Sequence, residues 1–177
     1  PLSLYPEIKS FQGYDRGKRG IGTRNYIILL GTSSLTGSYV KALEARFKNQ
    51  IKGLDGVVAV AHTEGGTGKL PNNYDLVLRT LAGFVVHPNV AAVLCVDYGS
   101  EVINNHVLKD YMEKHAYPIN EVPHAFLSLE GNFETSLEQG QKIIKEWLEP
   151  ASKIERETVP VSALKLGLQC GGSDASS

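Results

Sequence analysis

Cysteine is scarce in this 177-residue chain, which contains only Cys95 and Cys170. Cys95 lies inside an apolar run, and Cys170 lies in a glycine-rich turn. Two cysteines placed in this way do not make the disulfide framework of a small secreted domain, and alone they cannot form a zinc cluster. The sequence therefore predicts a protein of the reducing cytoplasm.

An excess of charge of one sign is also missing, because 18 Lys and Arg residues stand against 19 Asp and Glu residues. This balance gives no electrostatic reason to expect nucleic acid or an anionic membrane as a partner. No apolar run approaches the ~20 residues that a bilayer crossing requires. We therefore expect a soluble protein with no nucleic acid and no membrane partner, whose ligand is a small molecule.

What the chain does contain is a series of short apolar runs separated by segments of helix length. The intervening segments have apolar residues three or four positions apart, as helices do. Runs without strict alternation are typical of strands covered on both faces of a parallel sheet. We therefore predict an α/β fold with a doubly wound, mostly parallel, five-stranded sheet that has helices on both faces, a Rossmann-like arrangement. The five expected strands are 25–31, 56–62, 90–97, 124–130 and 164–170.

The expected strands define the organisation of the chain. Residues 1–24 read as an N-terminal arm or linker, and residues 25–177 as one α/β domain. In open α/β sheets ligands bind beyond the carboxyl ends of the strands. Five polar segments should therefore gather at one rim: GTSSLTGS, HTEGGTGK, DYGSE, EGNFE and CGGSD.

The segment HTEGGTGK (62–69) follows the second expected strand. His62 and Glu64 are candidate metal ligands or an acid/base pair, since imidazole and carboxylate suit both roles. A histidine that fixes the end of a strand is the alternative reading. The glycines suggest a phosphate cradle, but their spacing does not fit a Walker A loop. Lys69, with Ser33 and Ser34 in the preceding rim loop, is a candidate for substrate binding.

Three further groups of residues carry candidate chemistry. Arg16 and Arg24 precede the first expected strand and could hold an acidic substrate, since a guanidinium matches a carboxylate; a solvated basic arm is the alternative. Glu101 follows the third strand, where a helix cap is the commoner role of a carboxylate. Cys170 sits beside glycines and near Ser173 and Asp174, where backbone amides could lower the pKa of a thiol or a metal could bind it.

Four segments, in their order and spacing, resemble the altronate/galactarate dehydratase family of sugar-acid hydro-lyases. The most specific stretches are Gly-Leu-Gln-Cys-Gly-Gly-Ser-Asp at 167–174 and Gly-Thr-Arg-Asn at 22–25. The resemblance implies loss of water from an aldonic or aldaric acid to give a 2-keto-3-deoxy acid, assisted by a divalent metal, usually Fe²⁺. It also implies a longer polypeptide of which this is the middle part. The segments are GYDRGKRGIGTRNYIILL, VVAVAHTEGG, HPNVAAVLCVDYGSE and VPVSALKLGLQCGGSD.

The resemblance suggests roles for the candidate residues. His62 would be a base or metal ligand, Glu64 and Glu101 ligands or an acid, and Arg24 a carboxylate clamp. Cys170, with Ser173 and Asp174, would form the far wall of the site, and His62, Glu101 and Cys170 would hold the metal. The expected partners are a sugar acid and the remaining domains of the same enzyme, with a homo-oligomer left open.

The chain departs from the family in its thiols. No cysteine occurs in the loops after the first three expected strands, where the family often has one. Thiolates favour iron or zinc over magnesium, so this loss bears directly on the metal. Two alternatives follow: a related lyase with another leaving group, such as sulfite from a sulfo-substituted hydroxy acid, and a non-catalytic binding or assembly module.

Overall fold

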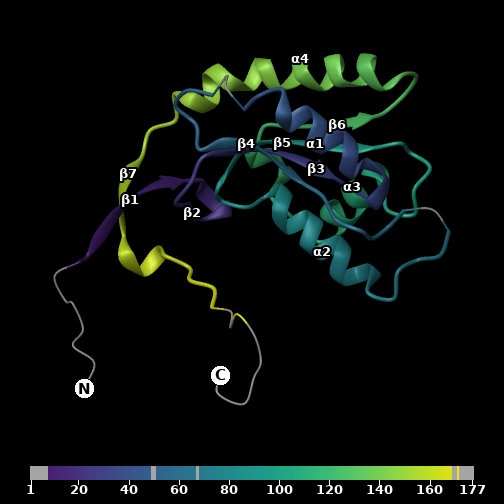
Figure 1. The fold of residues 1–177 in the computed structure, drawn as a ribbon. Coiled ribbons are helices and arrows are strands. Elements are labelled where there is room, and N and C mark those ends of the chain that lie inside the picture. The colour runs from purple at the N-terminus through teal and green to yellow at the C-terminus, as the bar shows by residue number, and fades with distance from the viewer. Residues whose placement is uncertain (1–7, 49–50, 67, 169–170, 172–177) are drawn as a thin grey trace.

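A four-stranded parallel sheet forms the centre of the computed structural model, which describes residues 8–48, 51–66, 68–168 and 171 (Figure 1). The strands lie in the order β4-β3-β5-β6. This order places β3 and β5 in the middle, and every residue of β5 is buried. The strands are β3 (Tyr26–Gly31), β4 (Gly56–Val60), β5 (Val90–Asp97) and β6 (His124–Ser128).

Two helices cover each face of this sheet (Figure 1). Because successive side chains of a strand point to opposite faces, Ile27 and Leu29 pack with α1 and α4, whereas Ile28 and Leu30 pack with α2 and α3. Burial on both faces explains why these runs are almost continuously apolar. The helices are α1 (Gly37–Ala45), α2 (Tyr74–Val85), α3 (Asn105–Lys114) and α4 (Phe133–Ser152); short 3-10 turns are η1 (Gly17–Arg19), η2 (Ser34–Thr36), η3 (Ile119–Glu121) and η4 (Val161–Ala163).

A second, antiparallel sheet lies beside the first and is made by β1 (Ser10–Asp15), β2 (Ile21–Gly22) and β7 (Glu157–Pro160). Its order is β2-β1-β7, so a strand from the first part of the chain pairs with a strand from the last part (Figure 1). Two guanidinium groups lie over the buried ring of Tyr14, that of Arg16 at 5.1 Å and that of Arg156 at 4.6 Å from the ring centroid. The segment expected to be an arm or linker therefore contains two paired strands within its described part.

The prediction of a fifth parallel strand at 164–170 is wrong for its described residues. Residues 164–168 form no strand, and residues 169–170 lie outside the described part of the chain. Leu166 is 78% exposed and Leu168 90% exposed. Lys165 and Gly167 alternate with the leucines, a pattern that would bury a lysine in a strand covered on both faces. The mixed α/β fold and the four preceding strands are confirmed.

The outer strand β4 has one of its edge amides covered from within the domain. The side chain of Glu44, on α1, accepts a hydrogen bond from the Ala59 N–H at 3.1 Å. An edge strand otherwise presents unpaired N–H groups to other chains.

Among the described residues, no helix combines the length and apolar composition required to span a membrane.

Gly140 marks the close approach of α4 to α1. A Cβ atom at this position would meet the Tyr39 hydroxyl and would lie 2.7 Å from Leu43 Cδ2, whereas a Cβ at Gly83 on α2 would meet nothing within 4 Å. We expect Gly140→Ala to lower the free energy of unfolding by about 1–3 kcal/mol through overpacking. Gly83→Ala should raise it by about 0.5–1 kcal/mol, because alanine is the better helix former. Denaturant unfolding measures both, and equal stabilisation by the two variants would contradict the tight contact.

Candidate functional site

The carboxyl ends of the four parallel strands meet at one edge of the sheet, and we call the loops that follow them the rim: residues 32–36, 61–66, 68–73, 98–104 and 129–132. Backbone hydrogen bonds join three of these loops. Ser34 N–H donates to the Glu64 carbonyl at 2.8 Å, Val102 N–H to Gly66 at 2.9 Å, and Ile103 N–H to Gly65 at 3.1 Å. The loop after β4 is therefore held on both sides by its neighbours.

The glycines of the loop after β4 are explained by this close packing. Gly65 has a φ of 72°, and a Cβ atom there would lie 2.8 Å from the Ile103 side chain. A Cβ at Gly66 would lie 2.6 Å from Ser34 Oγ. Both positions therefore favour glycine because the loops touch, which accounts for the Gly-Gly pair without a phosphate.

Glu101 connects the loop after β5 to the loop after β3. Its side chain is only 4% exposed, and Oε1 accepts hydrogen bonds from Ser33 Oγ at 3.1 Å and from the Tyr98 N–H at 2.8 Å. Oε2 is buried and has no hydrogen-bond partner among the described residues. A carboxylate oxygen enclosed without a partner is unusual, because such groups are costly to bury. It makes Glu101 both a structural link and a candidate ligand.

His62 has both ring nitrogens engaged at the end of β4. Nδ1 accepts a hydrogen bond from the Glu64 N–H at 3.2 Å, so Nδ1 carries no proton. Nε2 then carries the proton and donates to the Gly31 carbonyl at 3.1 Å. Burial lowers the pKa of His62, which agrees with a neutral ring. In this arrangement the ring fixes the loop against β3, and neither nitrogen is available as a base or metal ligand.

The neutral state of His62 predicts a pH dependence of stability. The native pKa is lowered below the ordinary value near 6.5, so protons bind more readily to the unfolded chain. The stabilisation is therefore complete above about pH 6.5 and is lost as the pH falls through the native pKa. Between pH 7.5 and pH 5.5 the wild-type protein should lose more unfolding free energy than His62→Asn, in which the other titrating groups are retained. Equal losses in denaturant unfolding would contradict a neutral His62.

Asp97, the last residue of β5, joins three elements and has both oxygens occupied. Oδ2 accepts from the Asn105 N–H and Oδ1 from Ser128 Oγ, each at 2.6 Å. The cap of α3 itself is Asn104, whose side chain accepts from the Val107 N–H at 3.0 Å. Asp97 therefore orders the rim and leaves proton transfer to other residues.

A groove of 300 Å³ lies beside His62 and Glu64, between the end of β4 and α2. Asn73 also lines it and was not indicated by the sequence, since an asparagine directly before a helix is typically a cap. Here Asn73 makes no side-chain cap hydrogen bond. The groove thus has a polar end near the rim and a largely apolar remainder; its other lining residues are Val60, Ala61, Leu76, Val77, Thr80, Leu81 and Phe84.

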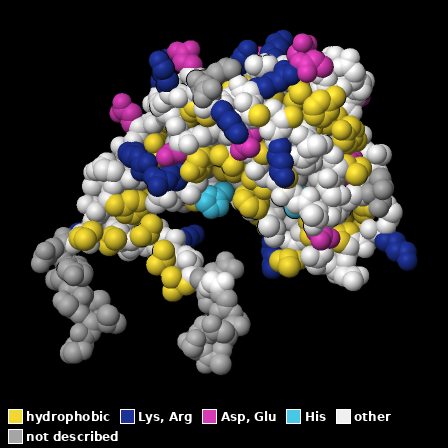
Figure 2. All heavy atoms as spheres, in the orientation of Figure 1, with side chains coloured by type: hydrophobic (Ala, Val, Ile, Leu, Met, Phe, Trp, Pro, Cys, Tyr) yellow, Lys and Arg dark blue, Asp and Glu magenta, His cyan; other side chains and the backbone are white. Residues whose placement is uncertain are grey.

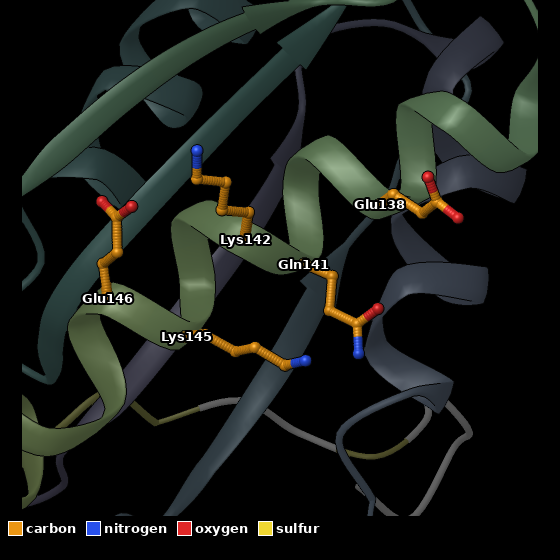
Figure 3. A pocket seen from close by; sticks show the side chains of 5 residues that line it. All are labelled: Glu138, Gln141, Lys142, Lys145 and Glu146. Atoms are coloured by element: carbon orange, nitrogen blue, oxygen red, sulfur yellow. The ribbon is translucent and has the colours of Figure 1, made fainter.

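A second depression lies on the outer face of α4 and offers no comparable chemistry. Figure 3 shows its lining side chains, which all come from this one helix: Glu138, Gln141, Lys142, Lys145 and Glu146. Opposite charges four residues apart are ordinary on a solvated helix face. We therefore place the candidate site at the rim.

The structure divides the sequence-predicted substrate residues between the two ends of the sheet. Ser33, Ser34 and Lys69 lie at the rim, where Ser33 is buried and also accepts a hydrogen bond from the Leu35 N–H, and Ser34 and Lys69 are exposed. Arg16 and Arg24 precede β3 and therefore lie at its amino end, away from the rim.

Both arginines have partners at that end. The largely buried Arg16 side chain donates to the Asn25 side chain at 2.6 Å and to the Pro88 carbonyl at 3.3 Å. Arg24 lies 3.8 Å from the carboxylate of Asp55. The structure therefore does not bring the two arginines together with His62 and Glu64. A segment that leads into a parallel strand lies at the opposite end of the sheet from a segment that follows a strand. Arg16 and Arg24 lead into β3, whereas His62 and Glu64 follow β4.

Of the expected metal ligands His62, Glu101 and Cys170, Cys170 lies outside the described residues. The expected catalytic residues Ser173 and Asp174 also lie outside them. Among the described residues there is no group of three or more His, Cys, Asp and Glu side chains that could hold a metal ion. The described residues thus do not form a metal site by themselves.

The fold and the rim define a class of protein: an α/β domain with hydroxyl and carboxylate groups at the carboxyl edge of a parallel sheet. The sequence model of one protein family, the second domain of D-galactarate dehydratase/altronate hydrolase, matches residues 13–152. The chain belongs to this family.

Three curated proteins are similar to the chain. Altronate dehydratase of Bacillus subtilis is 29% identical over 171 residues, which are 95% of this chain and 33% of that protein. Altronate dehydratase of Escherichia coli is 30% identical over 169 residues, 94% of this chain and 33% of that protein. The (2R)-sulfolactate sulfo-lyase subunit beta of Chromohalobacter salexigens is 29% identical over 169 residues, 96% of this chain and 40% of that protein. The chain therefore spans 33–40% of the length of these relatives.

Proposed function

We propose that this chain is the second domain of a sugar-acid dehydratase that removes water from an aldonate or aldarate and yields a 2-keto-3-deoxy acid. The family of the chain and its likeness to two altronate dehydratases support this proposal. In such a reaction a base takes the proton from the carbon next to the carboxylate, and hydroxide leaves from the following carbon with a proton from an acid. The resulting enol rearranges to the keto acid.

The observation that carries the proposal in this chain is the pair of His62 and Glu64 at the polar end of the groove. The hydrogen bonds described for Glu64 use its backbone, since its N–H donates to His62 and its carbonyl accepts from Ser34. His62 thereby fixes the backbone that carries the Glu64 side chain. We assign the proton transfer to the Glu64 carboxylate and the positioning of Glu64 to His62.

A divalent metal, expected to be Fe²⁺, would stabilise the negative charge of the enolate as a Lewis acid. Glu101 is the described residue best suited to contribute a ligand, because Oε2 is without a partner. However, this oxygen is enclosed and both nitrogens of His62 are engaged, so the described donors do not fit a metal on their own. The remaining ligands would come from elsewhere, and the proton transfer assigned to Glu64 does not depend on them.

The second candidate function is the elimination of sulfite from a sulfo-substituted hydroxy acid. It uses the same proton abstraction with a different leaving group, and the likeness to a sulfolactate sulfo-lyase subunit favours it. The described rim loops contain no thiol, and this absence favours neither of the two functions over the other.

A panel of aldonates, aldarates and sulfolactate, incubated with the longest natural form of the enzyme, tests the proposal. Formation of a keto-deoxy acid without sulfite would support the dehydratase, and sulfite release would support the second candidate. No turnover of any compound, in a preparation with confirmed metal content, would contradict both functions and favour a binding module.

A further inference from the structure

The strand β6 forms one outer edge of the parallel sheet, and within the described part of the chain its outer side is open. Its residues are half-buried or exposed, whereas every residue of the adjacent β5 is buried. Natural edge strands are commonly protected from other chains by charged residues, by proline or by a covering group. Glu44 covers an edge amide of β4 in this way, but β6 reads HAFLS and contains no Pro, Lys, Arg, Asp or Glu. An unprotected edge of this kind is suited to pairing with a further strand.

The backbone of β6 directs a set of hydrogen-bonding groups away from β5. Leu129 N–H donates to the Asp97 carbonyl at 2.7 Å, and the Pro123 carbonyl accepts from the Val93 N–H at 3.0 Å. Residues 123 and 129 therefore face β5, and because backbone groups alternate along a strand, the even-numbered residues between them face outwards. The described residues supply no partner for these outward N–H and C=O groups, which belong to His124, Phe126 and Ser128.

A hollow of 510 Å³ lies beside this edge, between the end of β6 and α4. Leu127 and Ser128 line it from the strand, and Lys142 and Glu146 line it from the helix. Figure 3 shows Lys142 and Glu146 on one side of α4, with Lys145 on the other. The space along the open edge is therefore bordered by one basic and one acidic side chain that are about one helical turn apart.

Both signs of charge occur along the exposed side of α4. Figure 2 shows basic and acidic side chains interspersed along the top of the view, over α4. A two-fold interface brings one surface against itself. Two copies of α4 that lie antiparallel can therefore place Lys142 of each copy opposite Glu146 of the other. A partner surface of a single charge sign would instead set a like charge against one of these two residues.

We propose that β6 pairs antiparallel with β6 of a second copy of this chain, so that the two parallel sheets join into one continuous sheet. Residues that face each other in an antiparallel pair can exchange N–H···O bonds. Phe126 then faces Phe126 of the second copy, and His124 faces Ser128 of the second copy, which gives every outward group of β6 a partner. The strand β4, with Glu44 at its edge amide, lies at both ends of the joined sheet, so the assembly stops at two copies. This pairing does not depend on the reaction proposed above.

Charge substitutions on α4 test the interface through the affinity of the dimer. Lys142→Glu places a carboxylate opposite Glu146 of the second copy at two symmetric positions, and should raise the dimer Kd about 10-fold. Lys145→Glu changes the charge equally on the other side of α4 and should leave Kd unchanged, and the double variant Lys142→Glu/Glu146→Lys should restore it. Sedimentation equilibrium of the longest natural form of the protein measures Kd. Equal values for Lys142→Glu and Lys145→Glu, or no recovery in the double variant, would overturn the proposal.

A zero-length crosslink tests the same contact directly. The longest natural form is prepared with ordinary nitrogen and with ¹⁵N, the two preparations are diluted together and reconcentrated so that subunits exchange, and a carbodiimide then joins amines to carboxylates in contact. We expect Lys142 linked to Glu146 with one peptide light and the other heavy, because such a link comes from two copies. Links confined to single copies, links from Lys142 to other carboxylates in place of Glu146, or a monomeric protein would each contradict the pairing.

Discussion

Replacing Glu64 by glutamine is expected to lower kcat of the natural enzyme by about 10²–10⁴-fold, the usual contribution of a positioned acid or base. The substitution keeps the backbone hydrogen bonds of Glu64 to His62 and Ser34, so the loop should retain its place. Only the capacity of the side chain to exchange a proton is removed. Steady-state kinetics on the substrate identified by the panel measure the effect, and the unfolding midpoint confirms that the fold is intact.

Glu130→Gln is the matched control for this prediction. Glu130 lies on another rim loop and is exposed, and its substitution changes the charge of the rim by the same amount. If Glu64→Gln lowers kcat no more than Glu130→Gln does, the loss reflects the negative charge of the rim and not proton transfer by Glu64. The single variant His62→Asn should also lower kcat and leave KM little changed, because His62 positions Glu64.

Glu101→Ala is expected to lower the free energy of unfolding by about 1–3 kcal/mol, because it leaves the buried hydroxyl of Ser33 without its acceptor. The N–H of Tyr98, which is only partly buried, loses its acceptor as well and adds a smaller amount. Both loops would lose the atom that joins them, so the effect should exceed that of Glu130→Ala, which removes an exposed carboxylate. Denaturant unfolding measures the two variants side by side.

Glu101→Gln separates the structural role of this residue from a chemical one. Glutamine keeps one oxygen acceptor for Ser33 and Tyr98 and replaces the unpartnered oxygen by an amide group. A protein that is as stable as the wild type but inactive would assign a chemical role to Oε2. Glu101→Ala with wild-type stability would show that the hydrogen bonds of Glu101 do not hold the loops together.

Burial explains how much of the fold could be predicted from the sequence. The runs that became β3, β4, β5 and β6 are apolar on both faces, and such short continuous apolar runs are visible without any contact information. The small antiparallel sheet was not predicted, because β2 has only two residues and β1 is half exposed, with Gly13 and the charged Asp15 among its residues. The segment 164–168 shares the leucine content of a strand, but composition could not indicate that it makes no pairing in the described structure.

The candidate site was predictable in its location and less so in its details. The rule that ligands bind at the carboxyl ends of parallel strands placed His62, Glu64 and Glu101 at one edge. The engagement of both His62 nitrogens depends on the carbonyl of Gly31, 31 residues away, which no local pattern reveals. Arg16 was proposed for its guanidinium chemistry, and the structure places it at the amino end of β3, away from His62 and Glu64.

The hydrogen bond from Ala59 to Glu44 has a consequence for the behaviour of many chains together. An unprotected outer strand can act as a template on which a strand from a neighbouring chain grows into an extended assembly. Glu44 fills one of the positions where such growth would begin and adds a negative charge there. An acidic residue of α1 that contributes little to the core thereby favours separate molecules over lateral aggregates in a crowded solution.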